Sequence, residues 1–519
     1  MIELTGDTLT IEALVAVARR HEKVADLGTR VKARMQASHE WVVSAIEGRG
    51  RVIYGVNTGF GSLANKVISA AEARQLSRNL ILLCVCGVGK PLGEDIVRGL
   101  MTIRANMLAK GNSGVRPLVA QTLIDMLNAG ITPVVPEKGS LGASGDLAPL
   151  SHIAAVLSRD QGEGDGGYSG QAWYKGELLE GAVAMKRAGI ERITLEAKEG
   201  LALSNGIDFM AACGALAVHD AENLLCHAQM GASLSFEALT GLTAALDPSL
   251  HEISNQPGNL RVASAILSLC KGSRLLDSDP ARLQDAYSLR CTPQVLGPIL
   301  DAVAFVRQRF AGALNAATDN PLIFPTGDGQ DLRAVSGGNF HGQGPALWLD
   351  FLGIAMAEVA DIAERRVFRM LTPELSNGLP AMLVTNNGLD GGLMMVQYTA
   401  AALVSDNKTL AHPDSVDSIP SCANQEDHVS MGANAARHCL EILDNVTNVL
   451  AIELMTAAQA VDLRFDGPAR LGAGTSRVYK AIRERVAFLD HDRPSSPDTQ
   501  SLAQLIREGS MALGMELYS

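Results

Sequence analysis

Within its first third the chain carries the segment Gly139-Ser140-Leu141-Gly142-Ala143-Ser144-Gly145-Asp146-Leu147-Ala148-Pro149-Leu150-Ser151-His152. It places Ala-Ser-Gly inside a glycine-dense turn, and an aspartate and an apolar, helix-like run follow. Because Gly145 has no Cβ, the turn can be tight enough for its amide nitrogen to reach the carbonyl carbon of Ala143. Closing that ring and dehydrating Ser144 would give an electrophile with an exposed methylene, which no ordinary side chain supplies.

At these residues the chain resembles the histidine and aromatic amino-acid ammonia-lyase family. The resemblance implies that Ala143-Ser144-Gly145 becomes the prosthetic group 4-methylidene-imidazol-5-one (MIO). Two other interpretations of the turn fit less well. The spacing is one residue short of the serine-hydrolase elbow G-x-S-x-G, and glycines at every third position differ from the phosphate-binding G-x-G-x-x-G. A second glycine-rich stretch, 87–91, also lacks the Walker pattern, so no nucleotide is expected.

The composition is that of a large protein with a mostly aliphatic core. Of 519 residues, 47% are hydrophobic and only 4% aromatic, and the net charge is −12. Because no basic run appears, we expect no nucleic-acid partner. The eight cysteines form no CxxC pair and no zinc-like cluster with histidine, so we expect no metal and a reducing, cytoplasmic location. No secretory signal is visible, and no apolar run approaches the roughly 18 residues of a membrane span.

Helical signals dominate, and they predict a mainly α fold: a long-helix bundle core with a smaller, mixed N-terminal catalytic region. The expected regions are 1–198, which carries the Ser144 loop, and 199–519, although one intertwined unit is the alternative. Thr10 is expected to cap a first helix. Further helices are predicted over 96–110, 115–128, 199–246, 346–371 and 429–460, strands over 51–54 and 322–324, a loop over 159–170 and a hairpin turn over 326–329.

Five further stretches are each similar to a motif of the same family, so the resemblance covers nearly the whole chain. In 53–61, Tyr54 stands on a glycine-rich loop, and the resemblance implies that it is the catalytic acid/base. In 199–206, Asn205 is implied to approach the prosthetic group and the substrate. In 336–343, Phe340 matches a family aromatic near the prosthetic group. Taken alone, the tyrosine would equally pack a turn, and the Asn-Gly pair would form one.

The fourth stretch, 284–294, supplies the expected carboxylate-binding group. On a helix, Gln284, Tyr287 and Arg290 would recur every third residue and share one face. Arg290 offers a two-pronged donor that matches a substrate carboxylate. The resemblance implies that Tyr287 is catalytic and that Gln284 lines the site. Without the motif, an exposed, ion-paired arginine is the alternative.

The fifth stretch, 418–431, resembles the histidine branch specifically. Glu426 stands where the phenylalanine and tyrosine branches usually carry glutamine, and a carboxylate in a pocket needs a donor such as an imidazole N–H. The family's substrate-selectivity pair, however, falls on Leu83-Cys84. Histidine enzymes typically have Ser-His there, tyrosine enzymes His-Leu and phenylalanine enzymes Phe-Leu. Leu83 and Cys84 make that wall apolar and small, so the two positions point to different substrates.

The leading hypothesis is an MIO-dependent ammonia-lyase, a carbon–nitrogen lyase, that acts on an aromatic or heteroaromatic L-amino acid. L-Histidine to urocanate is the first choice of reaction. Phenylalanine or tyrosine ammonia-lyase and a 2,3-aminomutase are the alternatives within the enzyme class, and a non-catalytic helical scaffold is the alternative outside it. The resemblance also implies a homotetramer whose four sites each draw residues from three subunits.

Overall fold

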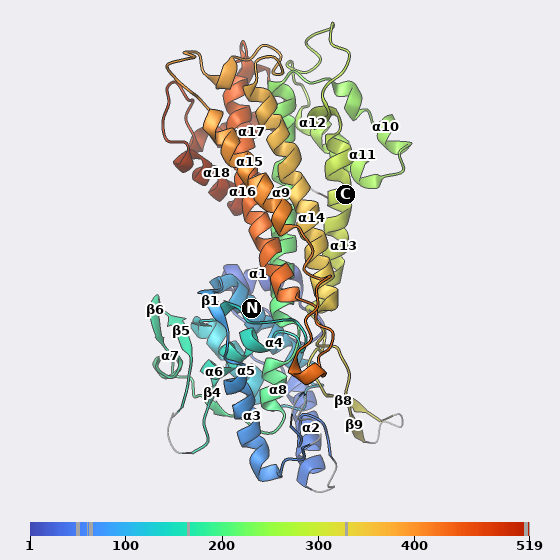
Figure 1. Ribbon diagram of the computed structural model, residues 1–519, viewed down its shortest axis with the longest axis vertical. Helices are drawn as coiled ribbons and strands as arrows, with labels where there is room; N and C mark the ends of the chain where they lie inside the picture. The colour runs from blue at the N-terminus through green and yellow to red at the C-terminus, as the bar shows by residue number, and fades with distance from the viewer. Residues whose placement is uncertain are drawn as a thin grey trace. The chain divides into compact units, whose positions relative to one another are not determined.

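The computed structural model describes residues 1–47, 52–59, 61, 66–162, 167–326, 331–512 and 517. The chain divides into two compact units, each assembled from three separate segments of sequence. Unit 1 contains Met1–Leu216, Arg307–Asp350 and Pro413–Arg437, and unit 2 contains Ala217–Val306, Phe351–His412 and His438–Ser519. Helices dominate the described chain (Figure 1), so the predicted mainly α fold class is confirmed. The division into regions 1–198 and 199–519 stays a prediction.

Unit 1 combines helices with short strands. Strand β1 pairs antiparallel with β3, and β8 pairs antiparallel with β9. Strand β5 lies between β2 and β6 and is antiparallel to both, whereas β4 and β7 are parallel. The elements that lie wholly in unit 1 are α1 (Ile11–Arg19), α2 (Thr29–Glu47), α3 (Ala70–Cys84), β1 (Val88–Pro91), α4 (Glu94–Ala109), α5 (Pro117–Ala129), β2 (Ile131–Pro133), β3 (Pro136–Lys138), α6 (Leu147–Leu157), β4 (Ser158–Arg159), β5 (Gln171–Tyr174), β6 (Glu177–Glu180), α7 (Gly181–Arg187), β7 (Ile193–Thr194), α8 (Glu199–Ser204), β8 (Leu322–Pro325), β9 (Leu332–Val335) and the 3₁₀ turn η4 (Cys422–Asn424).

Helix α4 is the centre of unit 1, because every side chain from Val97 to Ala109 is buried. Its arginine Arg98 donates to the backbone oxygens of Val17 in α1 and Leu127 in α5, at 2.9 and 3.2 Å. Both neighbouring helices are thereby tied to α4 through their last turns. The predicted cap is confirmed at the start of α1, where the Thr10 hydroxyl accepts from the Ala13 amide at 3.1 Å.

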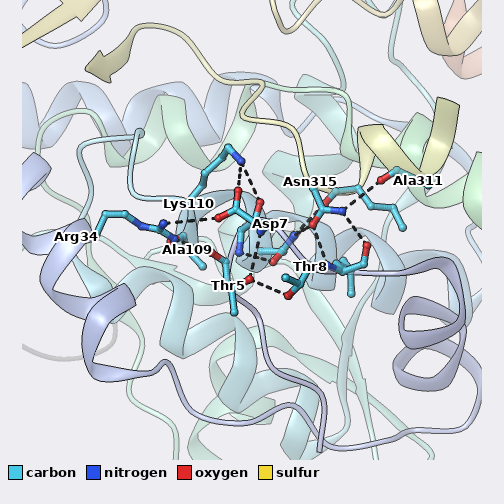
Figure 2. A network of polar contacts seen from close by, with 12 residues as sticks. Thr5, Asp7, Thr8, Arg34, Ala109, Lys110, Ala311 and Asn315 are labelled. Atoms are coloured by element: carbon cyan, nitrogen blue, oxygen red, sulfur yellow. Dashed lines mark hydrogen bonds and ion pairs between the residues drawn. The ribbon is translucent and has the colours of Figure 1, made fainter. Parts of the chain in front are cut away.

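The N-terminal segment is fixed to the same helix by a polar network, shown in Figure 2. Arg34 donates to the backbone oxygens of Thr5 and Ala109, each at 2.6 Å. Lys110 pairs with Asp7 at 2.5 Å, and this hydrogen bond holds the pKa of the carboxyl below its ordinary value. Asn315 exchanges two hydrogen bonds with the Leu9 backbone, at 2.9 and 2.8 Å (Figure 2). The first ten residues are therefore ordered by side chains far away in sequence.

Every regular element in the described residues of unit 2 is a helix. Its own elements are η2 (Thr243–Leu246), α10 (Pro248–Glu252), α11 (Pro257–Leu269), α12 (Tyr287–Arg290), η3 (Ala381–Leu383), α15 (Met394–Leu410), η5 (Gly467–Arg470), α17 (Ala473–Arg485), α18 (Ser496–Glu508) and η6 (Ser510–Ala512). The boundary between the units falls inside four long helices, α9 (Asp208–Ala238), α13 (Thr292–Ala313), α14 (Gln343–Leu371) and α16 (Gly432–Asp462).

A buried ion pair crosses the helical core of unit 2. Arg366 of α14 pairs with Glu453 of α16, and both side chains are inaccessible to solvent. Ser235 of α9 donates to the same carboxylate at 2.9 Å. Removing one partner of such a pair would leave a buried, uncompensated charge and strongly destabilise the packing of these helices.

Two predicted elements differ from the structure. The strand expected over 51–54 is wrong for its described residues. Ile53 instead opens a turn in which the amides of Val56 and Asn57 both donate to its backbone oxygen, at 3.1 and 3.2 Å. The Asn57 side chain accepts from the Ile53 amide at 2.7 Å, and this local bond competes with strand pairing. The other helices and the 322–324 strand are confirmed, but the long stretch 199–246 is broken after α8. Residues 327–329 of the expected turn and 163–166 of the expected 159–170 loop lie outside the described residues.

One described helical run, residues 287–313, is long and apolar enough by length and composition alone to cross a membrane. In its most apolar window 56% of the residues are buried inside the structure, as in the core helix of a folded domain.

Candidate active site

The Ala-Ser-Gly loop lies in unit 1, between β3 and α6. Two of its glycines have left-handed backbone, with φ of +67° at Gly142 and +75° at Gly145. A Cβ on Gly142 would overlap the hydroxyl of Ser430, and one on Gly145 would overlap the carbonyl of Gly206. Both positions therefore require glycine, for the backbone angle and for the close approach. Left-handed glycine backbone thus flanks Ala143 and Ser144 on both sides, and the approach of the Gly145 nitrogen to the Ala143 carbonyl carbon stays a prediction.

Asp146 fastens the end of this loop to the first turn of α9. Its amide donates to the Gly206 oxygen at 2.7 Å, and its carboxylate accepts from the amides of Phe209 and Met210 at 3.0 and 3.1 Å. The N-terminus of a helix favours an anion through such amides. Complete burial nevertheless outweighs them and raises the pKa of Asp146 to about 7.

Ser144 is held at both of its oxygens. Its hydroxyl donates to Glu426 Oε1 at 2.5 Å, and its backbone oxygen accepts from Asn205 Nδ2 at 2.7 Å. Asn205 caps the end of α8, and Arg104 of α4 fixes that turn by donating to the backbone oxygens of Ala202 and Asn205, at 2.7 and 2.9 Å. Among the described atoms, the Oδ1 of Asn205 is buried without a hydrogen-bond partner. An amide donor is thus fixed on the Ser144 oxygen.

Glu426 reaches Ser144 from a short, closed turn. The Ser421 amide donates to the Glu426 backbone oxygen at 2.9 Å, and the Ser421 hydroxyl donates to Oε2 at 2.8 Å. Within the described chain no cation lies at ion-pair distance from this carboxylate. Both oxygens of the Glu426 carboxyl group therefore accept hydrogen bonds from hydroxyl groups, one of them the hydroxyl of Ser144.

Tyr54 is half-buried on the turn that replaces the predicted strand. Its hydroxyl accepts from the Gly61 amide at 3.3 Å, which leaves its own proton available for donation. A Cβ on Gly55 would overlap Leu201 of α8, and one on Gly61 would meet the sulfur of Cys422. The Tyr54 turn thus touches the helix that ends in Asn205 and the turn that carries Glu426.

The selectivity pair ends α3, and its two members differ. Leu83 is 76% exposed, whereas Cys84 is buried against Leu80 and Leu201. Burial, with smaller contributions from the charges of Cys86 and Glu426, raises the pKa of the Cys84 thiol to about 11. The structure therefore buries Cys84 as a neutral thiol against Leu80 and Leu201 and leaves Leu83 at the surface of its unit.

Phe340 lies half-buried just before α14. Two residues further on, the Gly342 amide donates to the Gly142 oxygen at 3.0 Å, which ties this segment to the Ser144 loop. His341 bonds through Nε2 to the His428 oxygen at 3.1 Å, which ties this segment to the stretch that follows Glu426.

The carboxylate-binding group predicted from the sequence forms a compact cluster in unit 2. The Arg290 guanidinium stacks over the Tyr287 ring, 4.7 Å from its centre. With the Gln284 amide oxygen turned toward it, Arg290 donates to Gln284 through both terminal nitrogens. Helix α12 begins only at Tyr287, so Gln284 precedes the helix rather than sharing its face. Tyr287 is 70% exposed, and Arg290 Nε is buried without a partner among the described atoms. Tyr287 and Gln284 thus hold the Arg290 guanidinium in a defined orientation.

Sequence reasoning missed several residues that hold the site together. These are Asp146, Arg104, Gly206, Ser421 and Ser430, whose contacts with the loop and its partners are given above. Asp146 and Gly206 follow the recognised motifs directly, but nothing in a single sequence shows that the two segments touch. In the described ranges no group of three metal-binding side chains lies together.

Comparisons with known proteins place these features in context. A family model described as aromatic amino acid lyase matches residues 9–484. The histidine ammonia-lyase of Treponema denticola is 50% identical over 505 residues, which cover 97% of this chain and 96% of that protein. The crystal structure of histidine ammonia-lyase from Trypanosoma cruzi is 36% identical with a TM-score of 0.88, covering 98% of this chain and 94% of that one. Pantoea agglomerans phenylalanine aminomutase is 34% identical with a TM-score of 0.90, covering 98% and 100%.

Proposed function

Because the chain belongs to the aromatic amino acid lyase family and is an ammonia-lyase, we propose that its substrate is L-histidine and its product urocanate. The histidine ammonia-lyase of Treponema denticola is 50% identical to this chain, and the similarity extends over nearly the whole length of both proteins. The site itself supports the same substrate through Glu426. Its carboxylate has no cationic partner in the described chain and would lose the Ser144 donor once that hydroxyl is eliminated. An imidazole N–H is the donor that then fits.

The residues that would hold the prosthetic group fit its formation. Ala143-Ser144-Gly145 stands in a turn that glycine alone permits, and Asn205 Nδ2 donates to the oxygen that becomes the ring carbonyl. MIO, when formed, supplies the electrophile that activates the substrate for loss of ammonia. Asn205 stabilises negative charge on the Ser144 oxygen, since its amide is already aimed there. We propose no metal and no nucleotide.

The remaining roles follow from the chemistry of each side chain. Arg290 binds the substrate carboxylate, because a guanidinium matches a carboxylate with two parallel hydrogen bonds. Tyr287 and Gln284 orient that guanidinium. Tyr54 moves the proton of the substrate β-carbon, and Phe340 and the Leu83-Cys84 pair shape the pocket for the ring. Support for this assignment comes from the family motifs and from the contacts within each unit.

We further propose a cytoplasmic homotetramer in which one site combines residues from several subunits. Chains carrying Ser144→Ala and chains carrying Arg290→Ala would then complement each other when co-expressed, because some sites would receive both native residues. Light scattering gives the subunit number. A monomer, or a mixture with no recovered activity, contradicts the proposal.

Cys84 favours a second candidate. A neutral, buried thiol at this selectivity position makes that wall less polar than an imidazole pocket requires. A phenylalanine or tyrosine ammonia-lyase, or a 2,3-aminomutase, is therefore the alternative, and a solved aminomutase is similar to this chain.

The test is a panel of L-histidine, L-phenylalanine and L-tyrosine at equal concentrations. Ammonia release and the ultraviolet absorbance of the unsaturated acid report the lyase reaction, and chromatography for β-amino acids reports the mutase reaction. We expect the highest kcat/KM with histidine and none with the Ser144→Ala control. No turnover of histidine at millimolar concentration contradicts the substrate, whereas no turnover of any aromatic amino acid contradicts the reaction class.

A further inference from the structure

We propose that Glu426 has an earlier task, in the maturation of the chain: it delivers the proton with which the Ser144 hydroxyl leaves as water. This inference rests on the proposed function only in that MIO must form. It assigns one carboxylate two successive roles, first toward Ser144 and later toward the substrate ring.

The contact that carries the proposal is the hydrogen bond from Ser144 Oγ to Glu426 Oε1, at 2.5 Å. Bonds between a hydroxyl and a carboxylate at this length are short and strong, and they allow a proton to move between the two oxygens. The Ser421 hydroxyl and the closed backbone turn fix the carboxylate from its other side. A group so placed acts directly on the Cβ–Oγ bond, because its oxygen already touches the leaving atom.

The second carboxylate near the loop is directed elsewhere. Asp146 Oδ2 accepts from the Phe209 and Met210 amides, and Oδ1 lies 3.3 Å from the Ser140 hydroxyl. Its oxygens therefore serve α9 and the base of the loop. Asn205 Nδ2 donates a hydrogen bond to the backbone oxygen of Ser144. There it stabilises the negative charge that develops on this oxygen as the Cα–H bond breaks.

The step balances without another reactant. Ring closure between the Gly145 nitrogen and the Ala143 carbonyl carbon releases one water, whose hydrogens come from the amides of Gly145 and Ser144. The elimination then breaks the Cα–H and Cβ–Oγ bonds of Ser144 and forms the Cα=Cβ double bond. Glu426 takes up the Cα proton and passes it to Oγ, which departs as the second water. The carboxylate ends unchanged, and its Oε1 is vacated for a ring N–H.

The experiment follows the two water losses separately. Trypsin cleaves after Lys138 and Arg159, so the loop is recovered as the single peptide 139–159. Protein is made in a cell-free pulse, sampled over time, digested and weighed by mass spectrometry. A small thiol added to parallel samples labels only peptides that carry the methylidene. Neither readout depends on turnover of substrate.

In the wild type the peptide loses two waters and becomes thiol-reactive. In Glu426→Gln we expect the species that has lost one water to accumulate, with the second loss roughly 10²–10⁴-fold slower, as for removal of a general acid–base group. Glu426→Asp keeps a carboxylate and should recover part of the rate. Ser421→Ala is the matched control, because it removes the other hydroxyl on the same carboxylate and leaves Oε1 on Ser144. It should still lose both waters, and its second loss should be slowed far less than in Glu426→Gln, because the carboxylate keeps its backbone turn and its contact with Ser144.

Two results overturn the inference while leaving the proposed function intact. In the first, Glu426→Gln loses both waters at the wild-type rate. In the second, Glu426→Gln keeps both waters while the wild type loses them, which means that Glu426 shapes the loop and does not act at Oγ. A wild-type peptide that loses no water contradicts MIO formation, and both proposals fall with it.

Discussion

Asp146→Asn should change how the stability of the protein depends on pH. Burial raises the pKa of this carboxyl to about 7 in the folded chain, against an ordinary value of 3.8. Between these two values the folded state holds a proton that the unfolded state has released. The associated stabilisation is therefore complete below about pH 4 and is lost as the pH rises through 7.

The size of the effect follows from the two values. From pH 5 to about pH 7 the folded state binds one proton more than the unfolded state. Over these roughly two pH units the unfolding free energy therefore falls by about 2–3 kcal/mol, and above pH 7 it changes little more. The carboxamide that replaces the carboxyl cannot titrate, but its oxygen still accepts from the Phe209 and Met210 amides. The variant should therefore lack this part of the pH dependence and keep the rest.

Urea unfolding at pH 5, 6, 7 and 8 measures the difference, at fixed protein concentration and salt. Both proteins should carry Ser144→Ala, so that the loop is chemically identical in the two and unprocessed. Subtracting the unfolding free energy of the variant at each pH cancels the contributions of all other titrating groups. The reasoning is refuted if the two stability curves run parallel from pH 5 to pH 8, or if the chain with Asp146 gains on the variant as the pH rises.

Four further substitutions test the assigned roles. Ser144→Ala should abolish ammonia release and leave the circular dichroism spectrum and subunit number unchanged, because only the eliminated hydroxyl is lost. Arg290→Lys should lower kcat/KM by roughly 2–4 kcal/mol, whereas a loss under about 1 kcal/mol would identify a surface ion pair. Tyr54→Phe should lower kcat by roughly 10²–10⁴-fold, and a raised KM with unchanged kcat would mean that the phenol only positions substrate. Asn205→Leu should lower kcat by roughly 10²–10³-fold in the matured fraction, measured by thiol labelling, as for loss of an oxyanion donor.

The sequence predicts the helical architecture well because apolar periodicity and caps are local signals. Thr10 shows this, since its hydroxyl and the amide that it caps are three residues apart. Prediction from the sequence fails where a local hydrogen bond competes with the secondary structure that the apolar pattern favours. The segment at Ile53 looks like a strand by composition, yet Asn57 closes it into a turn.

The site was predictable residue by residue only where a family motif names the position. Ser144, Asn205 and Glu426 each lie in a recognisable stretch, but their mutual contacts join segments up to 282 positions apart in sequence. No periodicity encodes such a distance. The behaviour of Leu83 and Cys84 shows the same limit, because adjacent residues of equal hydrophobic character face solvent and interior respectively.

The close approach of Gly145 to Gly206 has a practical meaning for protein engineering. Gly145 leaves the space that the Gly206 backbone fills, and the two residues pair as a β-bridge, so the loop and the break between α8 and α9 pack together as one unit. Transplanting the Ala-Ser-Gly loop alone into another helical scaffold would leave it without the surface that compresses it. A transferable module must carry both segments, 139–146 and 204–210, in register, although some sixty residues separate them in the chain.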